Sequence, residues 1–148
     1  MLKKEALDTL IENLGKWQKI ERIGVRQTAE IQEQTDNPLI QLVMEIIQRD
    51  STLHYRVQKI LIDTLTTQAF TFSPDDLVEV WGAIEKHLAL ERKTIEIATS
   101  ALETLSKGQG RGYVIQQYLL SYLLADEQKH DKLLDDLATI KKGMYPYG

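Results

Sequence analysis

The sequence predicts an all-α protein, folded as an antiparallel four-helix bundle. Apolar residues recur every three or four positions through four long stretches, which is the spacing of one buried helix face. The strongest helix breakers, the three prolines and the glycine-rich segment 108–112, lie at the ends of these stretches. Four helices joined by short connections are typical of a bundle. We therefore expect one domain over residues 1–148, with helices at about 3–34, 38–66, 74–106 and 112–142.

The first two helices are predicted from their apolar stripes and from the signal that separates them. Asn37 precedes Pro38, and this pair combines a capping side chain with a proline at the first helical position. The chain on either side of the pair then shows one apolar stripe each. The first stripe consists of Leu7, Leu10, Leu14, Trp17 and Ile31, and the second of Val43, Ile47, Val57 and Leu61.

The last two helices begin after equally clear signals. Ser73 and Pro74 start the third helix, and the acidic residues that follow them face its dipole. The fourth helix begins at the end of segment 108–112 and ends at Gly143. Residues 66–72 have a strand-like composition, but one short run lacks a partner for a sheet, so we expect an extended connection there. The third stripe is Leu77, Trp81, Ile84, Leu88, Ile95, Ala98, Leu102 and Leu105, and the fourth is Leu120, Leu123, Leu134 and Leu137.

The composition excludes several classes of protein. With 43% hydrophobic and 27% charged residues, the chain is neither disordered nor membrane-spanning, and without cysteine it has no disulfide, catalytic thiol or cysteine-ligated metal. A net charge of −4 argues against a nucleic-acid binder. The N-terminal residues carry charges where a signal peptide needs an apolar stretch, so we expect a cytoplasmic protein. The apolar tail 144–148 is suited to cover the bundle end or a partner subunit, so a homodimer is one expected arrangement.

Each apolar stripe is interrupted near its middle by residues that are costly to bury alone. A buried carboxylate costs several kcal/mol unless it is paired or bound to a metal ion. Four such interruptions at matched positions therefore need a common explanation. The interrupting residues are Glu21 in the first stripe, Asp50 and His54 in the second, Glu91 in the third, and Glu127 and His130 in the fourth.

The positions of these residues predict which of them meet. Residues equidistant from a tight turn lie at the same height on the two helices that it joins. The midpoint of Glu21 and His54 is 37.5, at the turn before the second helix, and the midpoint of Glu91 and Glu127 is 109, inside the glycine-rich segment. We therefore expect Glu21 to meet His54 and Glu91 to meet Glu127.

A weak internal repeat relates the two halves of the chain. Residues 16–22 resemble residues 86–92, and residues 50–54 resemble residues 126–130. Each half is thus predicted to be a helical hairpin, with Glu-Arg on its first helix and Asp-x-x-x-His on its second. The matching positions are those expected to face inward.

This arrangement resembles the ferritin-like, rubrerythrin-type carboxylate proteins, in which helices one and three each supply a glutamate and helices two and four each supply Glu-x-x-His. Glu127-x-x-His130 matches the element of the fourth helix, and Glu21 and Glu91 match the single glutamates. The resemblance implies a metal centre of iron, or alternatively manganese or zinc. It also implies redox chemistry on oxygen or peroxide. The expected metal ligands are Glu21, Asp50, His54, Glu91, Glu127 and His130.

The chain departs from this pattern at one position. Three residues before His54, where the second helix should supply a bridging glutamate, the chain has Ser51, and the shorter Asp50 lies one residue earlier. We therefore expect the half of the site nearer His54 to bind metal more weakly than the half nearer His130.

Two alternatives remain open. The inward polar residues could form a hydrogen-bonded layer without metal, with Arg22 and Arg92 neutralising some of the acids, in a non-catalytic bundle that serves assembly or stress-related interactions. His87, one turn before Glu91, is interpreted as a flanking histidine, with an extra ligand or a hydrogen-bond donor as the alternatives. Whether the protein is an enzyme stays open.

Overall fold

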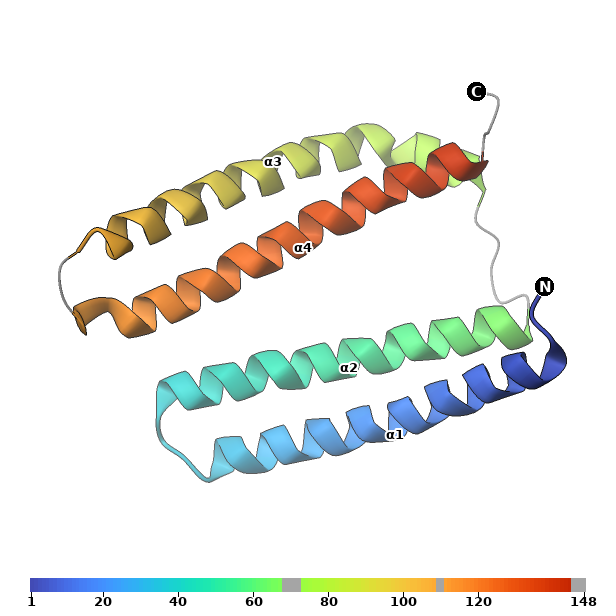
Figure 1. Cartoon of the computed structure of the whole chain (residues 1–148), viewed down its shortest axis with the longest axis horizontal. Helices are drawn as coiled ribbons and strands as arrows, with labels where there is room; N and C mark the ends of the chain where they lie inside the picture. The colour runs from blue at the N-terminus through green and yellow to red at the C-terminus, as the bar shows by residue number, and fades with distance from the viewer. Residues whose placement is uncertain (68–72, 109–110, 145–148) are drawn as a thin grey trace. The chain divides into compact units, whose positions relative to one another are not determined.

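The computed structural model describes residues 1–67, 73–108 and 111–144, and these residues are arranged in four long α-helices and one short 3₁₀ turn (Figure 1). No strand occurs within the described ranges, which confirms the all-α prediction. The helix ends lie within two residues of the expected ones. The elements are α1 (Lys4–Glu33), α2 (Pro38–Thr66), α3 (Pro74–Ser106), η1 (Arg111–Tyr113) and α4 (Val114–Met144).

The chain divides into two compact units, residues 1–71 and 72–148, and each unit is a helical hairpin. The packing of all four helices into a single domain stays a prediction. The expected extended connection lies largely outside the described residues, since 68–72 are not among them.

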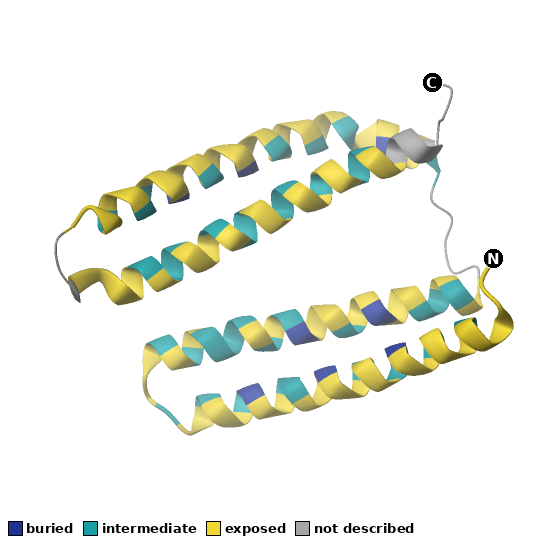
Figure 2. Cartoon of the chain, viewed as in Figure 1, coloured by how far each residue is buried: buried dark blue, intermediate teal, exposed yellow. Residues whose placement is uncertain are grey.

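In the first hairpin, α1 and α2 run in opposite directions and share a polar seam. Gln18 Nε2 donates to the carbonyl oxygen of Tyr55 at 3.3 Å, and Gln48 Nε2 donates to that of Val25 at 3.3 Å, so rising numbers on α1 meet falling numbers on α2. Asn37 caps α2 as expected, with its side-chain oxygen accepting from two backbone N–H groups. The buried residues recur every seven positions, and four of the five are polar (Figure 2): Leu14, Glu21 and Thr28 on α1, and Ser51 and Gln58 on α2.

The second hairpin begins with a capping box. The Ser73 side chain accepts a hydrogen bond from the Asp76 backbone N–H, and the Asp76 side chain accepts one from the Ser73 backbone N–H. Two backbone N–H groups at the start of α3 are therefore satisfied. The buried residues of α3 again fall at multiples of seven, at Leu77, Glu91 and Ala98. A buried glutamate therefore lies in the seam of each hairpin.

Within each hairpin taken by itself, the predicted apolar stripes are only partly covered. Trp17, Val57 and Leu123 are 52%, 50% and 48% exposed, although the sequence pattern assigns them to the core. The physical reason is that a pair of helices buries only the seam between its own two members. None of the helices in the described ranges combines the length and the apolar character that a membrane span requires.

Candidate metal centre

Three of the expected ligands converge in the second hairpin. Glu91 comes from the buried seam of α3, and Glu127 and His130 lie one turn apart on the facing side of α4. One ligand atom from each of the three lies within 4.8 Å of the other two. Glu91 is 6% exposed, and the other two side chains are half-buried. The expected meeting of Glu91 with Glu127 is confirmed.

The two oxygens of Glu91 have different surroundings. Oε1 lies 2.8 Å from His87 Nε2 and 3.4 Å from His130 Nδ1. Oε2 is buried and has no hydrogen-bond partner among the described residues. Because an unsatisfied buried acceptor costs about 1–3 kcal/mol, this oxygen needs a proton donor or a cation.

Glu127 lies against Glu91, and each carboxyl shifts the pKa of the other. The Glu91 carboxylate and burial raise the pKa of Glu127, while the hydrogen bond from Thr94 Oγ1 to Glu127 Oε2 at 3.2 Å acts in the opposite direction. The hydrogen bond with the Glu127 carboxyl, and then the contacts with His87 and His130, lower the pKa of Glu91. The opposite shifts mean that Glu127 loses its proton at a higher pH than Glu91 does, at the place where a metal ion would bind both carboxyl groups.

His130 is held from behind by an acid. Its Nε2 lies 3.4 Å from Asp126 Oδ2, and Asp126 in turn accepts from Lys129 Nζ at 2.6 Å. Its Nδ1 faces the carboxylates, at 3.4 Å from Glu91 Oε1 and 3.7 Å from Glu127 Oε2. A histidine that binds metal through one nitrogen commonly donates the other N–H to a carboxylate, which fixes its orientation.

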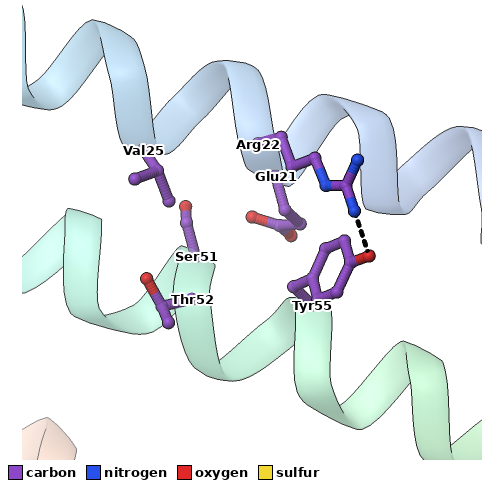
Figure 3. A pocket seen from close by; sticks show the side chains of 6 residues that line it. All are labelled: Glu21, Arg22, Val25, Ser51, Thr52 and Tyr55. Carbon is purple, nitrogen blue, oxygen red and sulfur yellow. Dashed lines mark hydrogen bonds between the residues drawn. The ribbon is translucent and has the colours of Figure 1, made fainter.

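The first hairpin satisfies its buried glutamate without a second carboxylate. Glu21 Oε1 accepts hydrogen bonds from Trp17 Nε1 at 2.9 Å and from Gln58 Nε2 at 3.5 Å, and it lies 3.3 Å from His54 Nδ1. The expected meeting of Glu21 with His54 is confirmed. Ser51 points from α2 into a cavity of about 230 Å³ beside Glu21 (Figure 3). The cavity is lined by Glu21, Arg22, Val25, Ser51, Thr52 and Tyr55.

The repeat seen in the sequence recurs in the contacts. Glu21 and Glu91 each lie near Nδ1 of a histidine, at 3.3 Å from His54 and 3.4 Å from His130. Oε1 of each glutamate is also in hydrogen-bond contact with a ring nitrogen of the residue four positions earlier on the same helix. The distance is 2.9 Å in the first hairpin and 2.8 Å in the second. The first helices correspond by a shift of 70 residues and the second helices by a shift of 76. The corresponding pairs are Glu21 with Glu91, Trp17 with His87, His54 with His130, Ser51 with Glu127, Gln58 with Leu134 and Asp50 with Asp126.

Asp50 joins neither cluster. It is half-buried, and the three-residue group of the second hairpin is the one set of converging ligands found in the described part of the chain. By the repeat, Asp50 corresponds to Asp126, which holds a histidine, and not to Glu127. The joint ligation of one centre by all six expected residues stays a prediction.

Two residues that contact the cluster, Thr94 and Asp126, were given no role in the site by the sequence, although Asp126 begins the repeated Asp-x-x-x-His motif. Both could have been found from helical spacing, since Thr94 follows Glu91 by three residues and Asp126 precedes His130 by four.

No family model, no curated protein and no solved structure matches this chain.

Proposed function

We propose that the chain is a metal-binding protein of the ferritin-like type, with its tightest site at Glu91, Glu127 and His130. The observation that carries this proposal is the buried Glu91 Oε2, which lacks a hydrogen-bond partner among the described residues in a cluster of two carboxylates and one imidazole. Two acids at such close range repel each other unless a proton or a cation lies between them.

The ligand types select the class of metal. Carboxylate oxygens together with a histidine nitrogen suit iron, and also manganese or zinc. Glu127 and His130 would reach the ion from α4 and Glu91 from α3, while Asp126 holds the imidazole in place. Bound iron would supply redox chemistry, and oxygen or peroxide is the class of substrate that we propose.

The ferritin-like four-helix bundle is the architecture that we propose around this site. Its support is the half-exposed apolar stripe of each hairpin, because such a stripe gains stability only when another layer covers it. A second copy of the chain would cover the same kind of surface, which makes a homodimer compatible with the proposal.

The test is a calorimetric titration of metal-free protein under anaerobic conditions with Fe(II), Mn(II) and Zn(II). We expect tight binding to wild type, and an affinity at least about tenfold weaker in Glu127→Gln and in His130→Ala. The matched control is His54→Ala, because His54 makes the equivalent contact in the first hairpin at 3.3 Å. This control should leave the tight site intact. Unchanged binding in both site variants would show that the metal lies elsewhere.

A second candidate function is supported by the first hairpin. There the buried glutamate is satisfied by neighbouring N–H groups, so an inward polar layer needs no metal to be stable. If the second hairpin works in the same way, the protein is a non-catalytic assembly module. Absence of binding for all three metals would favour this alternative.

A further inference from the structure

We propose that His87 is a positioning residue that donates its Nε2–H to Glu91 Oε1, and that it is not a metal ligand. The proposal deepens the proposed function, and its metal readout rests on that function. Three observations carry it: the contact itself, its counterpart in the first hairpin, and the distribution of partners over the two oxygens of Glu91.

The contact is short, and it joins neighbouring turns of one helix. His87 Nε2 lies 2.8 Å from Glu91 Oε1, and the two residues are four positions apart on α3. The imidazole is 61% exposed and the carboxylate is 8% exposed, so the ring reaches from the surface to a buried acid. An ionised carboxylate can only accept hydrogen bonds, and a nitrogen that contacts it at this distance must therefore carry the proton.

The first hairpin shows which role this position has. Trp17 takes the place of His87, and its Nε1 donates to Glu21 Oε1 at 2.9 Å. An indole N–H can donate a hydrogen bond but cannot bind a metal ion. The same position on the same kind of helix thus holds an N–H group against the buried glutamate in both hairpins, within 0.1 Å of the same length. Trp17 and His87 thus share the ability to donate a hydrogen bond from a ring N–H. They do not share the ability to bind a metal ion.

As a consequence, the two carboxylate oxygens of Glu91 have different roles. Oε1 faces both imidazoles, from His87 and from His130, while Oε2 remains buried without a hydrogen-bond partner among the described residues. Fixing Oε1 from the side of α3 restricts the rotation of the carboxylate. Oε2 is then the atom left for a metal ion. His87 is also absent from the group of ligand atoms that lie within 4.8 Å of one another.

The first experiment measures metal affinity in two variants of the same residue. His87→Trp installs the donor that the first hairpin uses, and we expect it to keep the Zn(II) and Fe(II) affinities within about threefold of wild type. His87→Ala removes the donor, and we expect about a tenfold loss, the size typical for residues that hold metal ligands in place. Circular dichroism checks that both variants are helical. If both variants lose affinity equally, His87 is a ligand and the proposal is wrong.

The second experiment needs no metal. Long-range ¹H–¹⁵N NMR of the imidazoles, on metal-free protein above neutral pH, reports which nitrogen of His87 carries the proton. The proposal predicts the Nε2–H tautomer, and a predominant Nδ1–H tautomer would overturn it. Because this measurement is independent of the ion, a protein that binds no metal would contradict the proposed function while the tautomer still decides the role of His87.

Discussion

Two carboxyl groups in one seam make the charge state of the second hairpin depend on pH. The Glu91 carboxylate raises the pKa of Glu127, and hydrogen bonding to the neighbouring carboxyl lowers the pKa of Glu91. A metal ion would compete with protons for these two carboxyl groups, because both bind the same oxygens. Metal affinity should therefore rise with pH as Glu127 loses its proton.

The same shifts predict how the stability of the metal-free protein depends on pH. A raised folded-state pKa means that Glu127 contributes stability below its unfolded-state pKa and loses it as the pH rises through the raised value. The lowered pKa of Glu91 acts in the acid range, where its contribution is lost as the pH falls through the lowered value. We expect the free energy of unfolding to decrease as the pH rises above the ordinary pKa of a glutamate, because Glu127 ionises at a higher pH in the folded protein than in the unfolded one. Urea denaturation at a series of pH values should show the decrease in wild type and a weaker one in Glu127→Gln. An identical slope in the two proteins would mean that folding does not raise the pKa of Glu127.

A second prediction concerns the acid behind His130. Asp126→Asn removes the charge that holds Nε2 of this histidine, so metal affinity should fall by about tenfold while the helices remain intact. The matched control is Asp50→Asn, at the corresponding position of the first hairpin. We expect it to change the affinity less than twofold, as measured by calorimetry. A larger loss in Asp50→Asn than in Asp126→Asn would return Asp50 to the set of ligands.

For each hairpin, the apolar periodicity and the capping residues predicted the helices, and the midpoints between residues predicted which side chains meet. Midpoints located the contacts of Glu21 with His54 and of Glu91 with Glu127, because a tight turn fixes the heights of residues on both of its helices. The same arithmetic does not predict which atom of a side chain faces its neighbour. The different partners of the two Glu91 oxygens depend on a rotamer that spacing leaves open.

The first hairpin has room for the carboxylate that it lacks. Ser51→Glu would place an acid in the cavity of about 230 Å³ beside Glu21, one turn before His54 on α2, and so copy the arrangement of the second hairpin. We expect a second equivalent of Zn(II) or Fe(II) to bind. The metal-free variant should be less stable by roughly 1–3 kcal/mol, since the new acid is buried near another. Ser51→Gln is the control, because it has the same length and no charge. A gain of metal in the control, or none in Ser51→Glu, would contradict the equivalence of the two hairpins.

Gln58 gives a prediction on the stability of the same hairpin. It is 2% exposed, and its Oε1 is buried without a hydrogen-bond partner in the described part of the chain. The corresponding residue of the second hairpin is Leu134. Gln58→Leu removes the unsatisfied acceptor, but it also removes the Nε2 donor that lies 3.5 Å from Glu21 Oε1, so the two effects oppose each other. We expect the free energy of unfolding to change by less than about 1 kcal/mol. Gln58→Ala removes the same donor and also leaves a cavity, so it should lower the free energy of unfolding by more. Thermal unfolding distinguishes the two, and equal destabilisation by both variants would contradict this balance.

For the molecule as a whole, the sequence predicted one domain of four packed helices, whereas the structure establishes each of the two hairpins by itself. The all-α class and the four helices are confirmed, and their ends agree because caps such as Asn37 and Ser73 are encoded locally. The assignment of the apolar stripes to one core stays a prediction, and within the first hairpin taken by itself Trp17 and Val57 are half-exposed. Periodicity reports that a face will be covered, and it does not report by which element. The same holds for the predicted six-residue centre, which needs both halves of the chain together.

The most direct test of the account is the metal content of the intact chain. Protein purified without chelators should be loaded anaerobically with Fe(II) or Mn(II), freed of excess metal by gel filtration, and analysed for metal per chain. We expect close to one equivalent in wild type and almost none in Glu91→Gln, since one converging cluster of ligands was found in the described part of the chain. Less than about a tenth of an equivalent in wild type would contradict a metal centre. Two equally retained equivalents would contradict the difference between the hairpins.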